Sequence, residues 1–236
     1  MKTIIHLWIL ALCALCIGCG SADTVPDRFI IIVIDRTDPM SIVPDAHQLC
    51  TQMGLKENPW QKIVVETTTI SDKDVNEVHV ITLKQETEWF TDEDLRKGEI
   101  KHFELQLKEC LSRLSAPAQC PYSIIYRNIQ RQATRLAASK AKSRWMLVYS
   151  DLAEHSSVSF YNPKVVDELQ THPEVVQKHL GIDEPLPDLR NVHIWLLYEP
   201  QSYEANQSYM VFAGFYQKVL SAKGAIVHID ANFSSQ

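Results

Sequence analysis

The distribution of apolar residues along the chain predicts six β-strands, and the first is the most uniformly apolar. Residues 29–34 (FIIIVI) contain no polar side chain, and the run ends at Asp35. An apolar, β-branched run of this length, closed by Asp and followed by Pro, is typical of a strand buried on both faces of a parallel sheet. The same reasoning predicts strands at 61–69, 77–83, 145–149, 192–198 and 225–229.

The segments between these strands predict helices at 44–53, 91–114, 123–139, 165–179 and 203–222. We expect Ser123 to cap its helix, a break near Gly98, an interruption at Pro173, and a helix end before Gly224. Residues 77–83 alternate between polar and apolar and follow a short polar turn, which predicts an antiparallel edge strand. The predicted fold is α/β: a doubly wound, mostly parallel six-stranded sheet with one antiparallel edge strand and helices on both faces.

The first 27 residues predict export and lipid anchoring. A lone Lys2 precedes an apolar run, so residues 1–18 match a secretory signal peptide. The sequence Cys-Ile-Gly-Cys at 16–19 resembles a bacterial lipobox, although Cys16 stands where such boxes prefer Leu. We expect lipidation at Cys19, a tether at 19–27 and one domain at 28–236, in the bacterial cell envelope outside the cytoplasm. Cleavage near Ala22 and an uncleaved anchor are the alternatives.

The net charge argues against one class of partner, and the positions of the cysteines predict a disulfide. The formal net charge of −6 argues against a nucleic-acid surface, which is normally basic. In an oxidising compartment, Cys110 and Cys120, which flank the loop SRLSAPAQ, are expected to form a disulfide, and closing such a loop contributes about 2–3 kcal/mol. In the alternative pairing, Cys50 bonds to one of them; otherwise Cys50 is a small buried apolar residue.

The candidate site residues lie at or near the ends of two predicted strands. Asp35 closes the first buried strand and Asp151 follows the fourth, and in a sheet whose order reverses beside the first strand these two strands are neighbours. Thr37 adds a hydroxyl, and Ser123 opens the helix that leads to the fourth strand. Carboxylate and hydroxyl oxygens suit Mg²⁺ or Mn²⁺. Asp35 and Asp151 could instead cap their own turns, and Ser123 could serve only as a helix cap.

These residues resemble the von Willebrand factor A (vWA) domain. The resemblance rests on DRTDP after the first strand, SII at a helix start and SDLAEHS after the fourth strand, and the order of elements agrees over nearly the whole mature chain. In that family, a metal-ion-dependent adhesion site combines a D-x-S-x-S loop with a Thr or Ser and an Asp from two other loops. The resemblance assigns Asp35, Thr37, Ser123 and Asp151 to these positions, while Pro39 replaces the last serine.

The resemblance implies a binding module and not an enzyme. A protein partner would engage the site, and an acidic residue of the partner would complete the coordination of the ion; the lipid anchor would hold the module on the membrane. One alternative is a Mg²⁺- or Mn²⁺-dependent hydrolase that uses the same carboxylates. Another is a scaffold subunit whose metal site has decayed, so that partner binding is unaffected by chelators.

Overall fold

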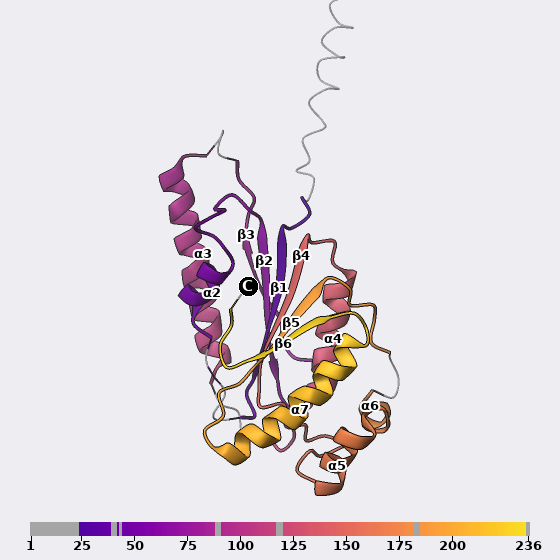
Figure 1. Ribbon diagram of the computed structural model, residues 1–236. Coiled ribbons are helices and arrows are strands. Elements are labelled where there is room, and N and C mark those ends of the chain that lie inside the picture. Colours follow the sequence, from indigo (N-terminus) through magenta and orange to yellow (C-terminus); the bar gives the residue numbers. More distant parts are fainter. Residues whose placement is uncertain are drawn as a thin grey trace, which may run out of the picture.

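One six-stranded sheet organises the chain (Figure 1). The computed structural model describes residues 24–38, 42, 44–87, 91–116, 120–181 and 185–234. The strand order is β3-β2-β1-β4-β5-β6. The strands are β1 (Arg28–Asp35), β2 (Ile63–Ile70), β3 (His79–Leu83), β4 (Ser143–Tyr149), β5 (Val192–Leu197) and β6 (Ile226–Asp230).

The predicted fold class is confirmed. β1 pairs in parallel with both β2 and β4, β5 continues the parallel sheet from β4, and β6 continues it from β5. Of the described strands, β3 alone is antiparallel, and it lies at the edge beside β2. The reason is the short turn before β3, because a parallel crossover needs about a dozen residues or more.

In the described part of the chain, six helices cover the two faces of the sheet (Figure 1). Alternate side chains of β1 enter two different cores, since neighbouring side chains of a strand point to opposite faces. Phe29, Ile31 and Val33 pack toward α4 to α7, whereas Ile30, Ile32 and Ile34 pack toward α2 and α3. The helices are α2 (Ala46–Gln52), α3 (Glu93–Leu114), α4 (Ile125–Ala138), α5 (Pro163–Thr171), α6 (Pro173–Leu180) and α7 (Tyr203–Ser221).

The structure corrects the helix prediction at Gly98 and Pro44 and confirms it at Pro173. α3 continues through Gly98 without a break, because a single glycine costs a helix only about 1 kcal/mol. α2 begins at Ala46 after the cap Asp45, and Pro44 lies outside it. The interruption at Pro173 is confirmed, since α5 ends at Thr171 and α6 begins at Pro173.

The predicted signal peptide, the lipidation site Cys19 and the Pro39 position lie outside the described residues. All six strands and both cores lie between Arg28 and Phe233. A chain that begins at Ser21 therefore keeps every packed element of the described fold.

Candidate functional site

The carboxyl ends of β1 and β4 meet at one edge of the sheet, as the sequence predicts. The two strands pair in parallel up to Ile34 and Tyr149, so Asp35, the last residue of β1, lies beside the pair Ser150–Asp151 that follows β4. The Asp35 side chain is buried, with only 2% of the residue exposed. We call this end of the sheet the site edge.

Asp35, Thr37 and Ser123 form a continuous set of oxygen atoms. The backbone N–H and the hydroxyl of Thr37 both donate to Asp35 Oδ1, at 2.9 and 2.7 Å. The Thr37 Oγ1 lies 2.9 Å from Ser123 Oγ, which comes from a loop 86 residues away in the sequence. Three of the four residues expected to form a site are therefore linked by hydrogen bonds, with Thr37 between Asp35 and Ser123.

Ser150 belongs to this set, although the sequence reasoning did not select it. Its hydroxyl donates to Asp35 Oδ2 at 2.6 Å and accepts from the backbone N–H of Leu152 at 2.9 Å. Both oxygens of the Asp35 carboxylate are thus held by hydroxyl groups. The signal available in the sequence was the position of Ser150, directly between an apolar strand and an aspartate.

Asp151, the fourth predicted residue, is a half-buried acid with a perturbed pKa. Burial, together with the weaker effect of the negative charges of Asp35 and Asp38, raises the pKa of its carboxyl group to about 7. Its Oδ1 accepts from the backbone N–H of Ala153 at 2.9 Å. Burial also raises the pKa of Asp35, against the hydrogen bonds from Ser150 and Thr37.

Ser123 does not cap its helix, so that part of the prediction is wrong. α4 begins at Ile125 after Ile124, which makes no side-chain capping bond. Ser123 instead pairs with His155 in an isolated β-bridge, with backbone bonds of 2.8 and 2.9 Å. This bridge fixes the loop that presents the Ser123 hydroxyl to Thr37.

Glu154 takes the capping role that Ser123 was expected to have. Its Oε2 accepts from the backbone N–H groups of Ile125 and Tyr126 at 2.9 and 2.7 Å. Only 1% of Glu154 is exposed, and burial raises the pKa of its carboxyl group to about 7. Because this capping residue lies about 30 residues after the helix start, the sequence around the helix start does not indicate it.

A pocket of about 520 Å³ opens beside Asp151. Its walls come from the loop after β4, α5, the residue after β5, and α7. They include the aromatic side chains of Tyr161, Tyr198, Tyr209 and Phe212. His155 is close by: its ring lies between those of Tyr122 and Tyr161, at 5.6 and 5.8 Å. A larger pocket of about 800 Å³ lies between α2 and α3, away from these carboxylates.

The side chains at the site edge present oxygen atoms, which suit a hard divalent ion, but few of these side chains are carboxylates. Within the described part of the chain, no group of three or more His, Cys, Asp or Glu residues could hold a metal. An ion would therefore need the hydroxyls of Thr37 and Ser123 in addition to Asp35 and Asp151, a set of oxygen ligands that suits Mg²⁺ or Mn²⁺. Among the described residues, no salt bridge reaches Asp35 or Asp151, so a cation would offset charges that are otherwise uncompensated.

Cys110 and Cys120 are free thiols in the structure, so the expected disulfide between them is not formed. Cys110 is buried in α3 and its Sγ lies 3.0 Å from Thr67 Oγ1 of β2, so it faces the sheet. Cys50 is also a free, buried thiol, as the non-bonded alternative expected, and burial raises its pKa to about 12.

Comparisons with known proteins do not identify a family. A scan against protein-family models finds none that matches, and a search of curated proteins finds no matching sequence. Among the described residues, no helix combines the length and apolar character needed to cross a bilayer. The structure shows an α/β domain with a six-stranded, mostly parallel sheet.

Proposed function

We propose that this chain is a vWA-like protein-binding module of the bacterial cell envelope. The partner would bind at the site edge, over Asp35, Thr37, Ser123 and Asp151, and Cys19 would carry a lipid anchor. The observation that carries the proposal is the set of hydroxyl and carboxylate oxygens contributed by three separate loops. Open α/β sheets bind ligands at this edge, where the strand order reverses.

Mg²⁺ or Mn²⁺ would supply positive charge that no described residue provides to Asp35 and Asp151. The two carboxylates and the hydroxyls of Thr37 and Ser123 would hold the ion, and Ser150 would keep the Asp35 carboxylate oriented through its 2.6 Å bond. A carboxylate of the partner would then be attracted to the bound cation. Partner binding of this kind would be lost in EDTA and would require an acidic residue on the partner.

A thermal melt of the chain from Ser21, in EDTA and then in Mg²⁺ or Mn²⁺, tests the metal step. A ligand present at a hundred times its Kd stabilises the folded state by about 2.7 kcal/mol, which for a domain of this size raises Tm by roughly 5–10 °C. We expect this increase for the wild type and for Asp167→Asn, an exposed control in α5. We expect no increase for Asp35→Asn or Asp151→Asn.

The measured quantity is the change in Tm caused by the metal in each variant, because removing a buried carboxylate alters the metal-free Tm by itself. A wild type that does not respond to either ion refutes the metal step. Partner binding that persists in EDTA would then favour the scaffold alternative, in which the metal site has decayed.

One observation favours a hydrolase as the second candidate. Asp151 lines the 520 Å³ pocket, and burial first, then the nearby carboxylates, raises its pKa to about 7, a value suited to general acid–base catalysis. Turnover of a simple phosphoester with Mg²⁺ or Mn²⁺, lost in Asp151→Asn, would support this alternative. No turnover together with metal-dependent partner binding supports the binding module.

A further inference from the structure

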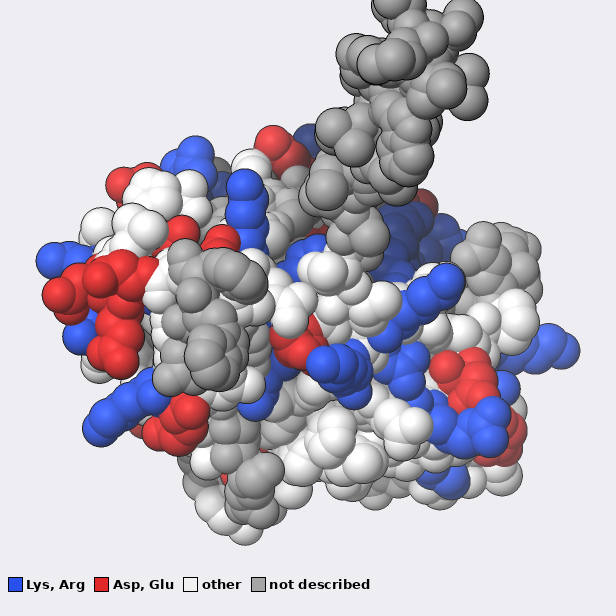
Figure 2. Space-filling view, turned by 90° about the horizontal axis from the view of Figure 1, so that it is seen from above, with Lys and Arg blue, Asp and Glu red and all other residues white. Residues whose placement is uncertain are grey.

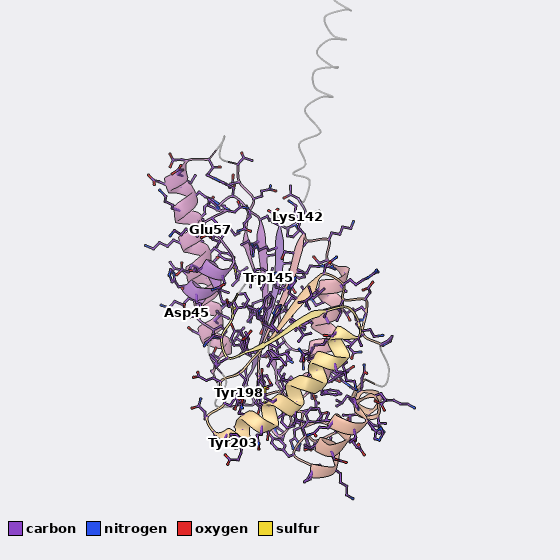
Figure 3. All side chains as sticks on the ribbon, viewed as in Figure 1. Asp45, Glu57, Lys142, Trp145, Tyr198 and Tyr203 are labelled. Carbon is purple, nitrogen blue, oxygen red and sulfur yellow. The ribbon has the colours of Figure 1, made fainter. Side chains whose placement is uncertain are left out.

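The end of the sheet opposite the site edge carries a group of basic side chains. They lie where the parallel strands begin, and we call them the basic edge: Lys62, Lys140, Lys142, Arg144, Arg190 and Lys223. Figure 3 shows Lys142 at this end of the sheet, with Tyr198 and Tyr203 at the other. Figure 2 looks onto this end and shows Lys and Arg side chains gathered over its right half.

Two acidic residues lie among these bases and leave an excess of positive charge. Asp27 accepts from Lys142 Nζ at 2.7 Å, and Asp188 accepts from Arg190 Nε at 2.8 Å. Arg144 donates to two backbone carbonyl groups and forms no described ion pair. Glu57 and Glu93, two other acidic residues, lie on the side of α2 and α3. All the residues of the basic edge except Lys62 belong to the half that carries β4 to β6.

The basic edge also contains a pocket that holds two guanidinium groups and one carboxylate. A cavity of about 540 Å³ is lined by Arg144, by Arg190 with its ion-pair partner Asp188, and by Ala137, Asn191, Gly224 and Ile226. The backbone approaches closely there, since a Cβ on Gly224 would lie 2.7 Å from Arg190 Cγ. Ile226 is 46% exposed, so an apolar surface adjoins the two guanidinium groups.

The predicted lipid anchor would bring this end of the domain to a membrane. Cys19 precedes Thr24, the first described residue, by five residues, which span at most about 18 Å when fully extended. β1 then begins at Arg28 and runs to Asp35. The basic edge would therefore lie close to the lipid, and the site edge would lie one strand length farther away.

We propose that the basic edge docks on the headgroups of anionic phospholipids and orients the site edge away from the membrane. The proposal rests on the proposed function only for the anchor. Lys and Arg side chains are attracted to an anionic membrane surface, guanidinium groups bind phosphate in a bidentate manner, and the exposed Ile226 can enter the interface between headgroups and acyl chains.

Vesicle co-sedimentation of the unlipidated chain from Ser21 tests the docking independently of the anchor. We expect binding to vesicles of phosphatidylcholine with 30% phosphatidylglycerol, weak binding to phosphatidylcholine alone, and a loss of binding at high salt, because salt screens surface charge. The test variant is Lys140→Glu/Lys142→Glu/Lys223→Glu, in which all three positions are exposed. It should bind the anionic vesicles at least ten-fold more weakly.

A second triple variant provides a control of equal net charge. Lys73→Glu/Lys164→Glu/Lys178→Glu changes three exposed lysines outside the basic edge, and we expect close to wild-type vesicle binding. Equal losses in both variants, or no preference of the wild type for anionic vesicles, would overturn the proposal. Saturation of the pocket by millimolar glycerol 1-phosphate, with no vesicle binding, would also overturn it and would assign the pocket to a free phosphate.

The two proposals fail in different ways. The test variant Lys140→Glu/Lys142→Glu/Lys223→Glu changes only residues of the basic edge, so its metal-dependent change in Tm should match that of the wild type. A wild type that binds anionic vesicles without responding to metal would refute the metal step alone. A metal response without vesicle binding would refute the docking alone. Unchanged circular dichroism spectra of both lysine variants show that their folds are intact.

Discussion

Replacing Glu154 with Gln should change stability in a way that depends on pH. Glu154 is buried, and its Oε2 accepts from two N–H groups at the start of α4. Two effects oppose each other at this carboxylate. Burial favours the protonated form, whereas the backbone N–H groups and the helix dipole favour the ionised form. The pKa of about 7 means that burial is the larger effect.

The sign follows from proton linkage. Because the folded state raises the pKa of Glu154, the folded protein holds this proton more tightly than the unfolded chain does. The associated stability is fully present below the ordinary pKa of 4.5 and is lost as the pH rises through about 7. Each pKa unit corresponds to about 1.4 kcal/mol, so Glu154 should lower the free energy of unfolding by about 3 kcal/mol over this window.

Gln keeps the shape and a carbonyl oxygen for the two N–H groups but never ionises. We therefore expect Glu154→Gln to match the wild type within about 1 kcal/mol at pH 5 and to be about 2–3 kcal/mol more stable at pH 8. Urea unfolding in EDTA, followed by the fluorescence of the buried Trp145 and Trp195, measures both values. Asp151 titrates in the same range, but it does so in both proteins and cancels in the difference.

An exposed residue provides the control. Glu57→Gln removes the same charge from an exposed position and should change the free energy of unfolding by less than about 0.5 kcal/mol at either pH. If Glu154→Gln is destabilised equally at pH 5 and pH 8, then Glu154 is ionised in the folded protein. The reasoning that burial exceeds the effect of the helix terminus would then be wrong.

Two further substitutions test features outside the site edge by urea unfolding. Gly224→Ala should cost about 1–3 kcal/mol, because Gly224 has φ +93° and a Cβ would lie 2.7 Å from Arg190 Cγ; a loss below 0.5 kcal/mol would refute the close approach. Arg96→Met should cost about 2–4 kcal/mol, because the buried guanidinium donates to the carbonyl oxygens of Pro59 and Gln61 at 2.7 and 3.1 Å. The neighbouring exposed Lys97→Met should have little effect and serves as the control for Arg96.

The sheet could be predicted from the sequence because each strand has a local pattern of apolar and polar residues that identifies it. The uniform apolar run before Asp35 predicts a strand buried on both faces, and alternation at 77–83 predicts the edge strand, where Ile81 and Leu83 are buried and Val80 and Thr82 are exposed. The neighbouring positions of β1 and β4 followed from the chain order of strands and helices. These predictions depend on local pattern and on loop length, which a single sequence contains.

The misassigned parts of the site depend on tertiary contacts. Ser123 is a residue type that favours helix caps, yet the N–H groups at the start of α4 bond to Glu154 instead. Ser150 could be recognised only with the register of β1 against β4, which brings its hydroxyl to Asp35. The absent disulfide has a similar origin, since the direction in which Cys110 faces is set by the packing of α3 on the sheet.

The loop after β4 connects the parts of the site edge. Ser150 holds the Asp35 carboxylate of β1, Asp151 faces the pocket, and Glu154 holds the start of α4. The backbone between them turns through Leu152, whose φ of 61° is uncommon for a residue with a branched side chain. The loop accepts this conformation because its own side chains fix it, with Ser150 accepting from Leu152 N and Asp151 from Ala153 N. An ion or partner that ionised Asp151 would therefore act on a segment already bonded to β1 and α4, and this loop would be the route by which the proposed binding at the site edge reaches the rest of the fold.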